Sequence, residues 1–580
     1  MPETRTLPIP IEHREFIVKV GGTAIEREHQ LLAVYIIKAA NKISSAKLVY
    51  LDGSASASDF PLSNTDRFIP GQQVEILAGS GSDPVSLFQG VVVRQSLKIR
   101  DHTAPQLVIE CRHAAFKLTV ARNSAYFFDQ TDSEIIEALL EQGTIASDVE
   151  TTAVRHKQQV QYDATGWDFL LTRAEANGKL VFTNDNKVTV KAPVLSGSPV
   201  CTLQFGATIL ELDAAIDARD QYSAVKSFTW DAAQQSLLDK EAAAPRFTPP
   251  GNLSRDDLAD VVALEHYPLR HVALQEDEAQ AWADAQWLKS ALGQVSGRIK
   301  CEGIATVKPG DGVSLSGVGD RYSGTVYVTG VRQDFDLVQG WKTHIQFGSL
   351  EGWFAAEQSV SAPKAAALLP GINGLQVGIV TSNEDPDGED RVRVRMPLVD
   401  DGEEGTWARV ATLDAGKERG TFFRPEIGDE VVLGFLNDDP RQAVILGMFH
   451  SSANPAPLKG SDDNHEKLFQ SRSKLKLYFN DDKKVIRLET PAGNKITLSE
   501  DEKAIALEDQ NGNKILMNQD GITINSSQAI VLKAGTEIKI ESGTALNVKG
   551  GTQLKLEGTA GVDLTSTAIT KVKGSLIQLN

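Results

Sequence analysis

The most regular stretch of this chain is residues 521–564, which read GITINSSQAIVLKAGTEIKIESGTALNVKGGTQLKLEGTAGVDL. Two apolar residues separated by a single residue recur every eight positions, from Ile522-Thr523-Ile524 to Val562-Asp563-Leu564. Apolar residues at i and i+2 are typical of a short strand with one buried face, and the glycines between the pairs mark turns. Each octad therefore predicts a strand followed by a corner, and the fixed period indicates a repeat architecture.

The apolar positions of the octads are the predicted core of this repeat. A last octad, Thr570-Lys571-Val572, keeps the phase with a weaker first position, whereas residues 576–580 slip by one. We interpret this slipped end as the place where a separate tip docks, through Leu576, Ile577, Gln578, Leu579 and Asn580. The predicted core residues are Ile522, Ile524, Ile530, Leu532, Ile538, Ile540, Leu546, Val548, Leu554, Leu556, Val562, Leu564 and Val572.

Two architectures fit an octad repeat. In a single-chain solenoid with three octads per coil, about sixty residues make fewer than the roughly three coils that independent stability needs. In the other, three identical chains wind together, and each supplies one wall of a triangular prism. Each octad then climbs one strand spacing of about 4.8 Å, and the walls have no free edge. We favour the second architecture, a stiff trimeric needle.

Composition limits the classes of function that suit this chain. Its 580 residues have a net charge of −18, which argues against nucleic-acid binding because DNA binders need a basic face. The first residues are not followed by an apolar segment, so we expect no secretory signal and synthesis in the cytoplasm. Cys111, Cys201 and Cys301 form no CxxC pair, and we expect buried reduced thiols.

The region before the octads begins with strands and contains an internal similarity. Pro70-Gly71 precedes an alternating strand and the partner strand ending Val93-Arg94-Gln95. The same order returns at Pro309-Gly310, with a partner strand that ends Val331-Arg332-Gln333. We interpret the two hairpins as a duplication. A trimer of such chains would present six similar barrels, which suits contact with a six-fold object.

Helices are expected between the two hairpins. Residues 131–142 have the pattern of a capped amphipathic helix, and residues 163–178 that of a helix closed by a C-cap glycine. A third helix is expected over 275–292, where Trp282 and Trp287 are interpreted as packing anchors rather than as a ligand site.

The C-terminal half continues with a linker and a small barrel. Residues 355–374 are rich in Ala and Pro, as in a linker. Five short strands within 375–458 fit a closed barrel of the OB type, and its acidic loops favour a structural collar over nucleic-acid binding. The near-repeats at Gly493-Asn494-Lys495-Ile496 and Gly512-Asn513-Lys514-Ile515 predict wider strands of the same prism.

These motifs together resemble those of VgrG spike proteins of type VI secretion systems and their relatives in phage-tail-like contractile injection particles. In contractile phages, the corresponding parts are the baseplate hub protein and the cell-puncturing needle. The most specific motifs are residues 424–447, which include Arg424-Pro425-Glu426-Ile427-Gly428-Asp429, and the octads. Residues 9–58 resemble the spikes of phage-tail-like particles more than those of cell-bound machines.

The resemblance implies a function and a set of partners. It implies a homotrimeric spike at the centre of a baseplate, which connects the inner tube to the membrane-puncturing tip and helps to deliver effectors. The implied partners are the inner tube protein, the baseplate hub and wedge proteins, a PAAR-type tip protein and effector cargo, with the target membrane crossed mechanically. The protein would become part of an assembled injection particle, either released or membrane-attached.

The predicted fold is mainly β with some α. It consists of two related hub barrels with a mixed α+β insert, an OB-fold collar and a C-terminal trimeric triple-stranded β-helix. The predicted domains are the first hub barrel (1–125), the hub insert (126–295), the completion of the second barrel (296–354), the linker (355–374), the collar (375–458), transition strands (459–520) and the needle (521–580).

An enzymatic function is the alternative that the sequence leaves open. His465-Glu466 is not part of the zinc-protease motif HExxH, and the acidic loop at 383–390 does not follow the EF-hand order. Only residues 451–471 separate the collar from the needle, too few for the lysozyme that the phage puncturing protein has there. We expect no catalytic residues, cofactor or metal, and no C-terminal effector. A trimeric β-helical tailspike or adhesin acting on envelope polysaccharide is the second hypothesis.

Overall fold

The computed structural model describes residues 15–79, 84–195, 198–348 and 354–579. The chain divides into two compact regions, each described by itself. The N-terminal region is Met1–Ile372 with Asn437–Pro440, and the C-terminal region is Asn373–Leu436 with Arg441–Asn580. No helix in the described ranges is both long enough and apolar enough to cross a membrane.

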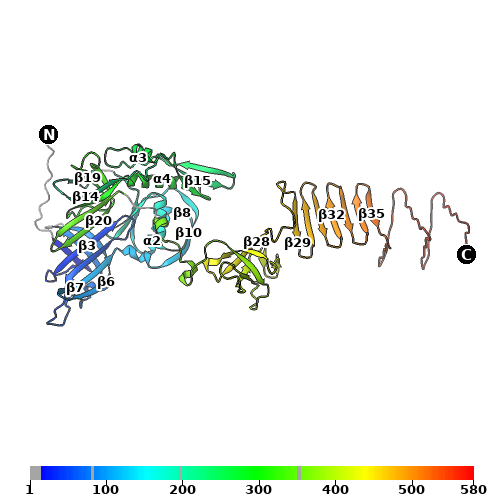
Figure 1. Ribbon diagram of the computed structural model, residues 1–580, viewed down its shortest axis with the longest axis horizontal. Coiled ribbons are helices and arrows are strands. Elements are labelled where there is room, and N and C mark those ends of the chain that lie inside the picture. The colour runs from blue at the N-terminus through cyan, green and yellow to red at the C-terminus, as the bar shows by residue number, and fades with distance from the viewer. Residues whose placement is uncertain (1–14, 80–83, 196–197, 349–353, 580) are drawn as a thin grey trace. The chain divides into compact units, whose positions relative to one another are not determined.

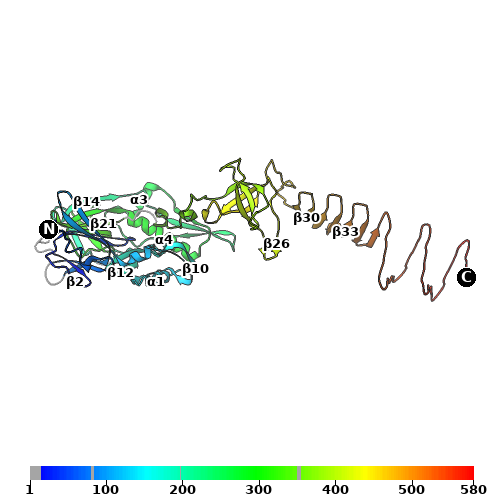
Figure 2. The same cartoon turned by 90° about the horizontal axis from the view of Figure 1, so that it is seen from below.

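The N-terminal region is built around a 13-stranded sheet that contains two five-strand modules of the same topology (Figures 1 and 2). In each module the first two strands in sequence pair with each other, and the last three follow in reversed order. The first module is β3 (Leu31–Ala39), β4 (Ser45–Leu51), β7 (Thr103–Arg112), β6 (Val85–Arg100) and β5 (Gln73–Gly79). The second is β14 (Ile209–Ile216), β18 (Val295–Glu302), β21 (Gly340–Phe347), β20 (Gly324–Asp336) and β19 (Gly312–Ser316).

The neighbouring ladders within both modules are antiparallel, and an antiparallel pairing of β20 with β3 joins the two modules. The expected duplication is therefore confirmed by strand order. The first strand of the second module, β14, lies far along the chain from β18, within the range expected for the insert. Edge strands complete the sheet: β1 (Glu15–Val20), β2 (Thr23–Ala24) and β13 (Cys201–Gln204).

The two Pro-Gly hairpins make the same backbone contacts. The Gly71 amide donates to the Val92 carbonyl at 2.9 Å, and the Gly310 amide donates to the Val328 carbonyl at 2.8 Å. Both glycines have φ near +100° (106° and 97°), which an L side chain rarely adopts. The ladder is bulged directly after Val92 and directly after Val328.

This register corrects one part of the sequence argument. Because Val92 is equivalent to Val328, Arg94 is equivalent to Gly330 rather than to Arg332. The shared Val-Arg-Gln segments are thus two positions out of step, although the duplication that they suggested is present. The Pro-Gly turns were the informative signal, because the turn geometry itself requires glycine at that position.

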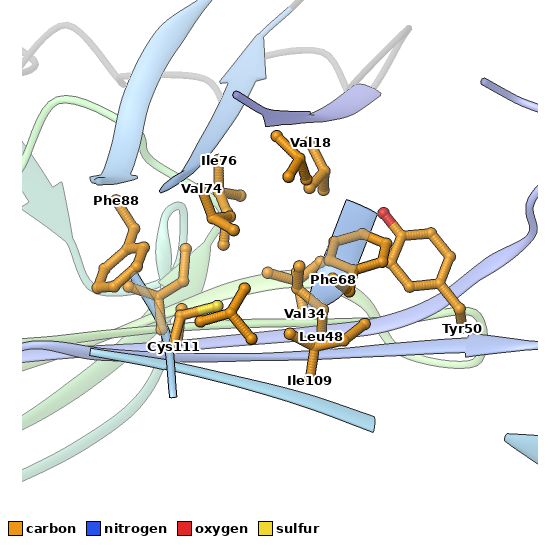
Figure 3. Close-up of a cluster of buried hydrophobic side chains, with 14 of the residues drawn as sticks. Val18, Val34, Leu48, Tyr50, Phe68, Val74, Ile76, Phe88, Ile109 and Cys111 are labelled. Atoms are coloured by element: carbon orange, nitrogen blue, oxygen red, sulfur yellow. The ribbon is translucent and has the colours of Figure 1, made fainter. Parts of the chain in front are cut away.

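The first module covers a core that every one of its strands helps to form (Figure 3). Leu48, Ile76, Phe88 and Ile109 have no solvent exposure, and each such side chain contributes about 2 kcal/mol of burial free energy. Cys111 lies among them, and burial raises the pKa of its thiol to about 12. A separate core under the second module contains Cys301.

None of the three cysteines, all of which lie in the described ranges, takes part in a disulfide. Cys111 and Cys301 are buried, in agreement with the expectation, whereas Cys201 is half-buried. Burial and the nearby Asp311 carboxylate raise the pKa of the Cys201 thiol to about 11.

The expected helices form on smaller sheets between the modules. α1 (Asp132–Gln142) begins with the predicted capping box, in which Thr131 and Glu134 bond each other's backbone amides. α2 (Gly166–Ala176) starts three residues later than expected because Thr165 is its N-cap. Trp287 lies on α4 (Glu276–Gly293) and is buried, and its indole donates to the Tyr222 carbonyl at 3.0 Å, so it acts as the expected packing anchor. The remaining elements are β8 (Arg122–Thr131), β9 (Ala146–Val149), β10 (Arg155–Thr165), β11 (Leu180–Asn184), β12 (Lys187–Lys191), β15 (Val225–Asp231), β16 (Ser236–Glu241), β17 (Tyr267–His271), α3 (Arg255–Val262) and α5 (Phe354–Glu357).

The C-terminal region begins with a closed five-stranded barrel, as the sequence predicts. Its interior is filled by small aliphatic side chains such as Val394, Val431 and Ile445, all nearly inaccessible to solvent. The barrel strands are β22 (Gln376–Ser382), β23 (Val392–Arg395), β24 (Thr406–Val410), β28 (Ala443–Met448) and β27 (Glu430–Phe435), and a small hairpin, β25 (Ala415–Gly416) and β26 (Arg419–Gly420), follows β24.

A seven-stranded antiparallel meander follows the barrel, and each strand pairs with the next along the chain (Figure 1). Its last strand contains Ile522 and Ile524, so pairing within the chain extends into the first octad. The meander strands are β29 (Glu466–Gln470), β30 (Lys476–Asn480), β31 (Val485–Glu489), β32 (Lys495–Ser499), β33 (Ala504–Glu508), β34 (Lys514–Asn518) and β35 (Gly521–Asn525).

Candidate assembly interface

One face of the meander is a continuous pair of apolar columns. The register places the second and fourth residues of neighbouring strands opposite one another, so that Ile496 faces both Leu488 and Leu507. The first column runs Phe469, Leu477, Leu488, Ile496, Leu507, Ile515 and Ile524. The second runs Phe479, Ile486, Leu498, Ile505, Met517 and Ile522.

These columns are largely open to solvent in the single chain. Leu488 is 47% exposed and Leu498 is 44% exposed, although regular strands hold both side chains in place. A groove of about 1380 Å³ runs along this face, and Phe422 and Phe423 from the loop between β26 and β27 line it as well. An apolar surface of this extent indicates a protein interface.

From the second octad on, the apolar face continues without strand pairing in the chain itself. From Ser526 to Leu579 the described residues form no strand, and Figures 1 and 2 show a trace that winds without arrows. The thirteen predicted core residues are 51–71% exposed, with Val562 and Ile522 at the limits. A single-chain solenoid would bury these residues against its own coils, so the exposed positions contradict that architecture.

The predicted tip-docking residues lie at the end of this segment. Leu576 and Leu579 are 83% and 91% exposed, and Ile577 and Gln578 are exposed as well. Asn580 lies outside the described residues.

Only part of the meander was predicted from the sequence. Ile496 and Ile515 were expected from a nineteen-residue near-repeat, whereas Leu488 and Leu507, which lie on strands of the same face, were not. The signal was present, since apolar pairs at i and i+2 start at 477, 486, 496, 505 and 515. These spacings alternate between nine and ten residues, so nineteen is the length of two strands with their turns.

In the acidic loop of the barrel, the carboxylate of Asp385 is paired with Arg391. Both carboxylate oxygens of Asp385 accept from the Arg391 guanidinium at 2.8 Å, and the backbone amides of Asp387 and Glu389 donate to Asp385 as well. These contacts hold the pKa of the Asp385 carboxyl well below its usual range. The loop is thus organised as a structural turn, in line with the interpretation of the barrel as a collar.

A buried ionic cluster organises the helical part of the N-terminal region. Asp132, at the start of α1, contacts Nε2 of His156 at 3.1 Å and Nη1 of Arg173 at 3.4 Å. Nδ2 of Asn177 donates to the same carboxylate at 2.7 Å. Because α1, α2 and β10 each supply one or more members, the cluster cross-links these elements; none of its members was singled out from the sequence.

Three segments of the chain match models of protein families. Residues 11–336, more than half of the chain, match the Alg8 N-terminal domain. Residues 376–450 match the type VI secretion system/phage-baseplate injector OB domain. Residues 485–551 match the phage baseplate V C-terminal trimerisation domain. The last match covers most of the meander and the first octads.

Curated relatives point the same way. The type VI secretion system spike protein VgrG1b of Pseudomonas aeruginosa is 25% identical over 268 residues, which cover 42% of this chain and 36% of that protein. VgrG3 of Vibrio cholerae, another spike protein of that system, is 32% identical over 99 residues, which cover 15% of this chain and 9% of that protein. The matched segment thus spans little more than a third of VgrG1b and less than a tenth of VgrG3.

Among solved structures, an Escherichia coli component of the type VI secretion system aligns with a TM-score of 0.39 and 14% identity, over 74% of this chain and 99% of that chain. This is a loose likeness of fold. The family matches and the curated relatives confirm the resemblance expected from the residues. The chain belongs to the family of the Alg8 N-terminal domain and, with its injector OB and trimerisation domains, is a VgrG-like spike protein.

Proposed function

We propose that this chain is a structural subunit of a homotrimeric spike at the centre of a contractile injection baseplate. The observation that supports this most directly is the apolar face of the C-terminal region. It runs through seven strands and continues through the octads, where the chain offers it no partner of its own. Two further copies of the same chain would bury it about a three-fold axis.

The trimer would form a mechanical needle. Each octad strand would pair with strands of the other two chains, so pulling out one chain would break every rung along its length. Outward residues such as Thr523, Lys539 and Asn547 would keep the flanks hydrophilic, and passage through a membrane would be forced by the machine. We assign no catalytic residue, and the matched family descriptions do not favour the polysaccharide-degrading tailspike.

The N-terminal region would seat the needle on the machine. Three chains with two modules each would present six modules of one topology, a number suited to a six-fold inner tube. We propose the inner tube protein and the baseplate hub and wedge proteins as partners at this end. At the other end we propose a PAAR-type tip protein bound by residues 576–580, with effector cargo delivered by the particle.

The mass of the full-length protein in solution tests this proposal. We expect three times the chain mass of 62.8 kDa by light scattering. Ile540→Asp should shift the protein towards monomer, because it would place three carboxylates about the apolar axis. Asn547→Asp adds the same charge at an outward position and should remain trimeric.

A monomeric unsubstituted protein would refute the spike. A heat- and SDS-resistant trimer that tolerates Ile540→Asp would refute the assignment of the octad core.

A further inference from the structure

The outer face of the meander has a column of alternating charge. The register places Lys476, Glu489, Lys495, Glu508 and Lys514 opposite one another on successive strands. Glu508 accepts from Lys495 on one side and from Lys514 on the other, each at 2.7 Å, and Lys476 approaches Glu489 at 4.0 Å. Opposite charges that face each other across strands stabilise their pairing, and like charges weaken it.

The sequence continues this column beyond the last pairing within the chain. The position that holds Lys514 in β34 holds Asn525 in β35, and the equivalent octad position is three residues after the first apolar residue. At that position the next four octads have Lys533, Glu541, Lys549 and Glu557. The alternation of sign therefore resumes after one neutral residue.

The octad charges lie opposite the apolar pairs. Lys539 contacts Glu541 at 2.5 Å, and Lys555 contacts Glu557 in the same way. Residues at i and i+2 of a strand share a face, so these four side chains lie on the side away from Ile540 and Leu556. All four are about 70% exposed.

Three-fold symmetry determines which charges meet between chains. At each level the equivalent octads of the three chains supply one wall each, and every chain moves to the next wall at the corner that ends its octad. The strand above a given octad on any wall is therefore the following octad of a partner chain, about 4.8 Å away. Lys533 would face a partner's glutamate at 541, and that glutamate would face the next partner's lysine at 549.

We propose that this column forms a ladder of ion pairs between chains that holds the three octad segments in one register. The proposal rests on the trimeric spike proposed above. The apolar pairs repeat every eight residues, so they cannot distinguish the correct register from a slip of one octad. The charges alternate, so a slipped chain would face like charges on both sides.

The collar and the meander set the register where the octads begin. Further along, a chain that looped out one octad would refit all its apolar pairs with its partners. Exposed ion pairs add little net stability, but the contrast between attraction and repulsion can still select one arrangement. A second set of outward charges supports the same register. Lys555 and Lys571 lie one octad before and one octad after Asp563, so in the correct register the Asp563 of one chain would face lysines of its partner chains on both sides.

Engineered cysteines in the full-length chain report the register. With Asn547→Cys and Lys555→Cys together, the correct register brings cysteines of neighbouring chains within disulfide reach, and oxidation should link three chains covalently. With Asn547→Cys alone, each chain has one introduced cysteine, and in the correct register these cysteines lie on three different walls and form no disulfide. A chain that slips by one octad brings its introduced cysteine next to that of a neighbouring chain, and oxidation then yields a covalent dimer. The unsubstituted chain, oxidised in parallel, controls for Cys111, Cys201 and Cys301.

The two reporters are then combined with charge variants. In a uniform-charge variant, Glu541→Lys, Glu557→Lys and Asp563→Lys, we expect the covalent dimer of the single-cysteine reporter to rise several-fold above background. In an inverted variant, Lys533→Glu, Glu541→Lys, Lys549→Glu and Glu557→Lys, the alternation is kept between chains although the pairs within a chain are lost. This variant should keep the single register.

Each outcome is decisive. A uniform-charge variant without slipped dimer, or an inverted variant that slips as much as the uniform one, would overturn the ladder. Light scattering on the same samples separates this result from failure of the proposed function, because an unsubstituted monomer would exclude the trimer itself.

Discussion

At the scale of single residues, Asp132 shows how the N-terminal region uses a buried charge. Burial disfavours the carboxylate, but hydrogen bonding with His156 and the positive charge of Arg173 outweigh that effect. The net result is that the pKa of Asp132 lies below its ordinary value of 3.8. An ion at this position is tolerated because several partners surround it, and removal of one partner exposes the others to the full cost of burial.

Asp132→Asn should lower the free energy of unfolding by about 3 kcal/mol, because His156 and Arg173 would lose the negative charge that they contact. Because the folded pKa is depressed, the stabilisation is complete above the unfolded value near pH 3.8 and is lost as the pH falls through the folded pKa. The difference between wild type and variant should therefore shrink below about pH 4. Urea denaturation followed by tryptophan fluorescence measures both effects.

The matched control is Asp148→Asn. Asp148 also has a basic partner, Lys187, but the Asp148 side chain is 62% exposed. The free energy of unfolding should therefore change by no more than about 0.5 kcal/mol. Equal losses in the two variants would show that the buried cluster has no special role.

At the scale of secondary-structure elements, the meander and the octads differ in where their strands find partners. Two meander turns repeat the same contacts, with the Gly493 amide bonded to Thr490 and the Gly512 amide bonded to Asp509. These turns reverse the chain, so each strand pairs with its successor. Residues 526–579 contain no such reversal, and the described structure gives them no strand partner within the chain.

Hydrogen exchange should separate these two elements. In the unsubstituted protein, we expect protection of amides in both β31–β34 and the octads. In the Ile540→Asp variant, octad amides should exchange at nearly unfolded rates because their partners belong to other chains, whereas β31–β34 should keep most of their protection. Equal loss of protection in both segments would contradict separate pairing modes.

At the scale of the whole molecule, the chain combines a duplicated N-terminal region with a repetitive C-terminal one. The two modules share strand order but differ in their surroundings, since β13 pairs in parallel with β19, whereas β1 pairs in antiparallel fashion with β5. Two similar but unequal modules per chain are consistent with a trimer that meets a six-fold partner without strict six-fold symmetry.

Deletion of residues 576–580 tests the proposed tip contact at this scale. The truncated protein should remain trimeric, because all thirteen predicted core residues are retained. It should lose at least about ten-fold in affinity for a PAAR-type tip protein, about 1.4 kcal/mol, measured by co-sedimentation or calorimetry. Undiminished binding of the tip would refute this docking site, and loss of the trimer would show that these residues belong to the core.

Features that neighbouring residues encode could be predicted from the sequence. The octad period, the capping box at Thr131 and the five barrel strands follow from local patterns, and the octads together with residues 424–447 led to the family resemblance. Local periodicity and capping are legible because their physical cause lies within a few residues.

Contacts between distant segments became visible only in the folded chain. It showed that Val92 matches Val328, that β20 joins β3, and that Asp132 meets His156. It also aligned the charges at 476–514 into one column. Such pairings depend on which surfaces pack together after the chain has closed long loops, and no local pattern in the sequence specifies that choice.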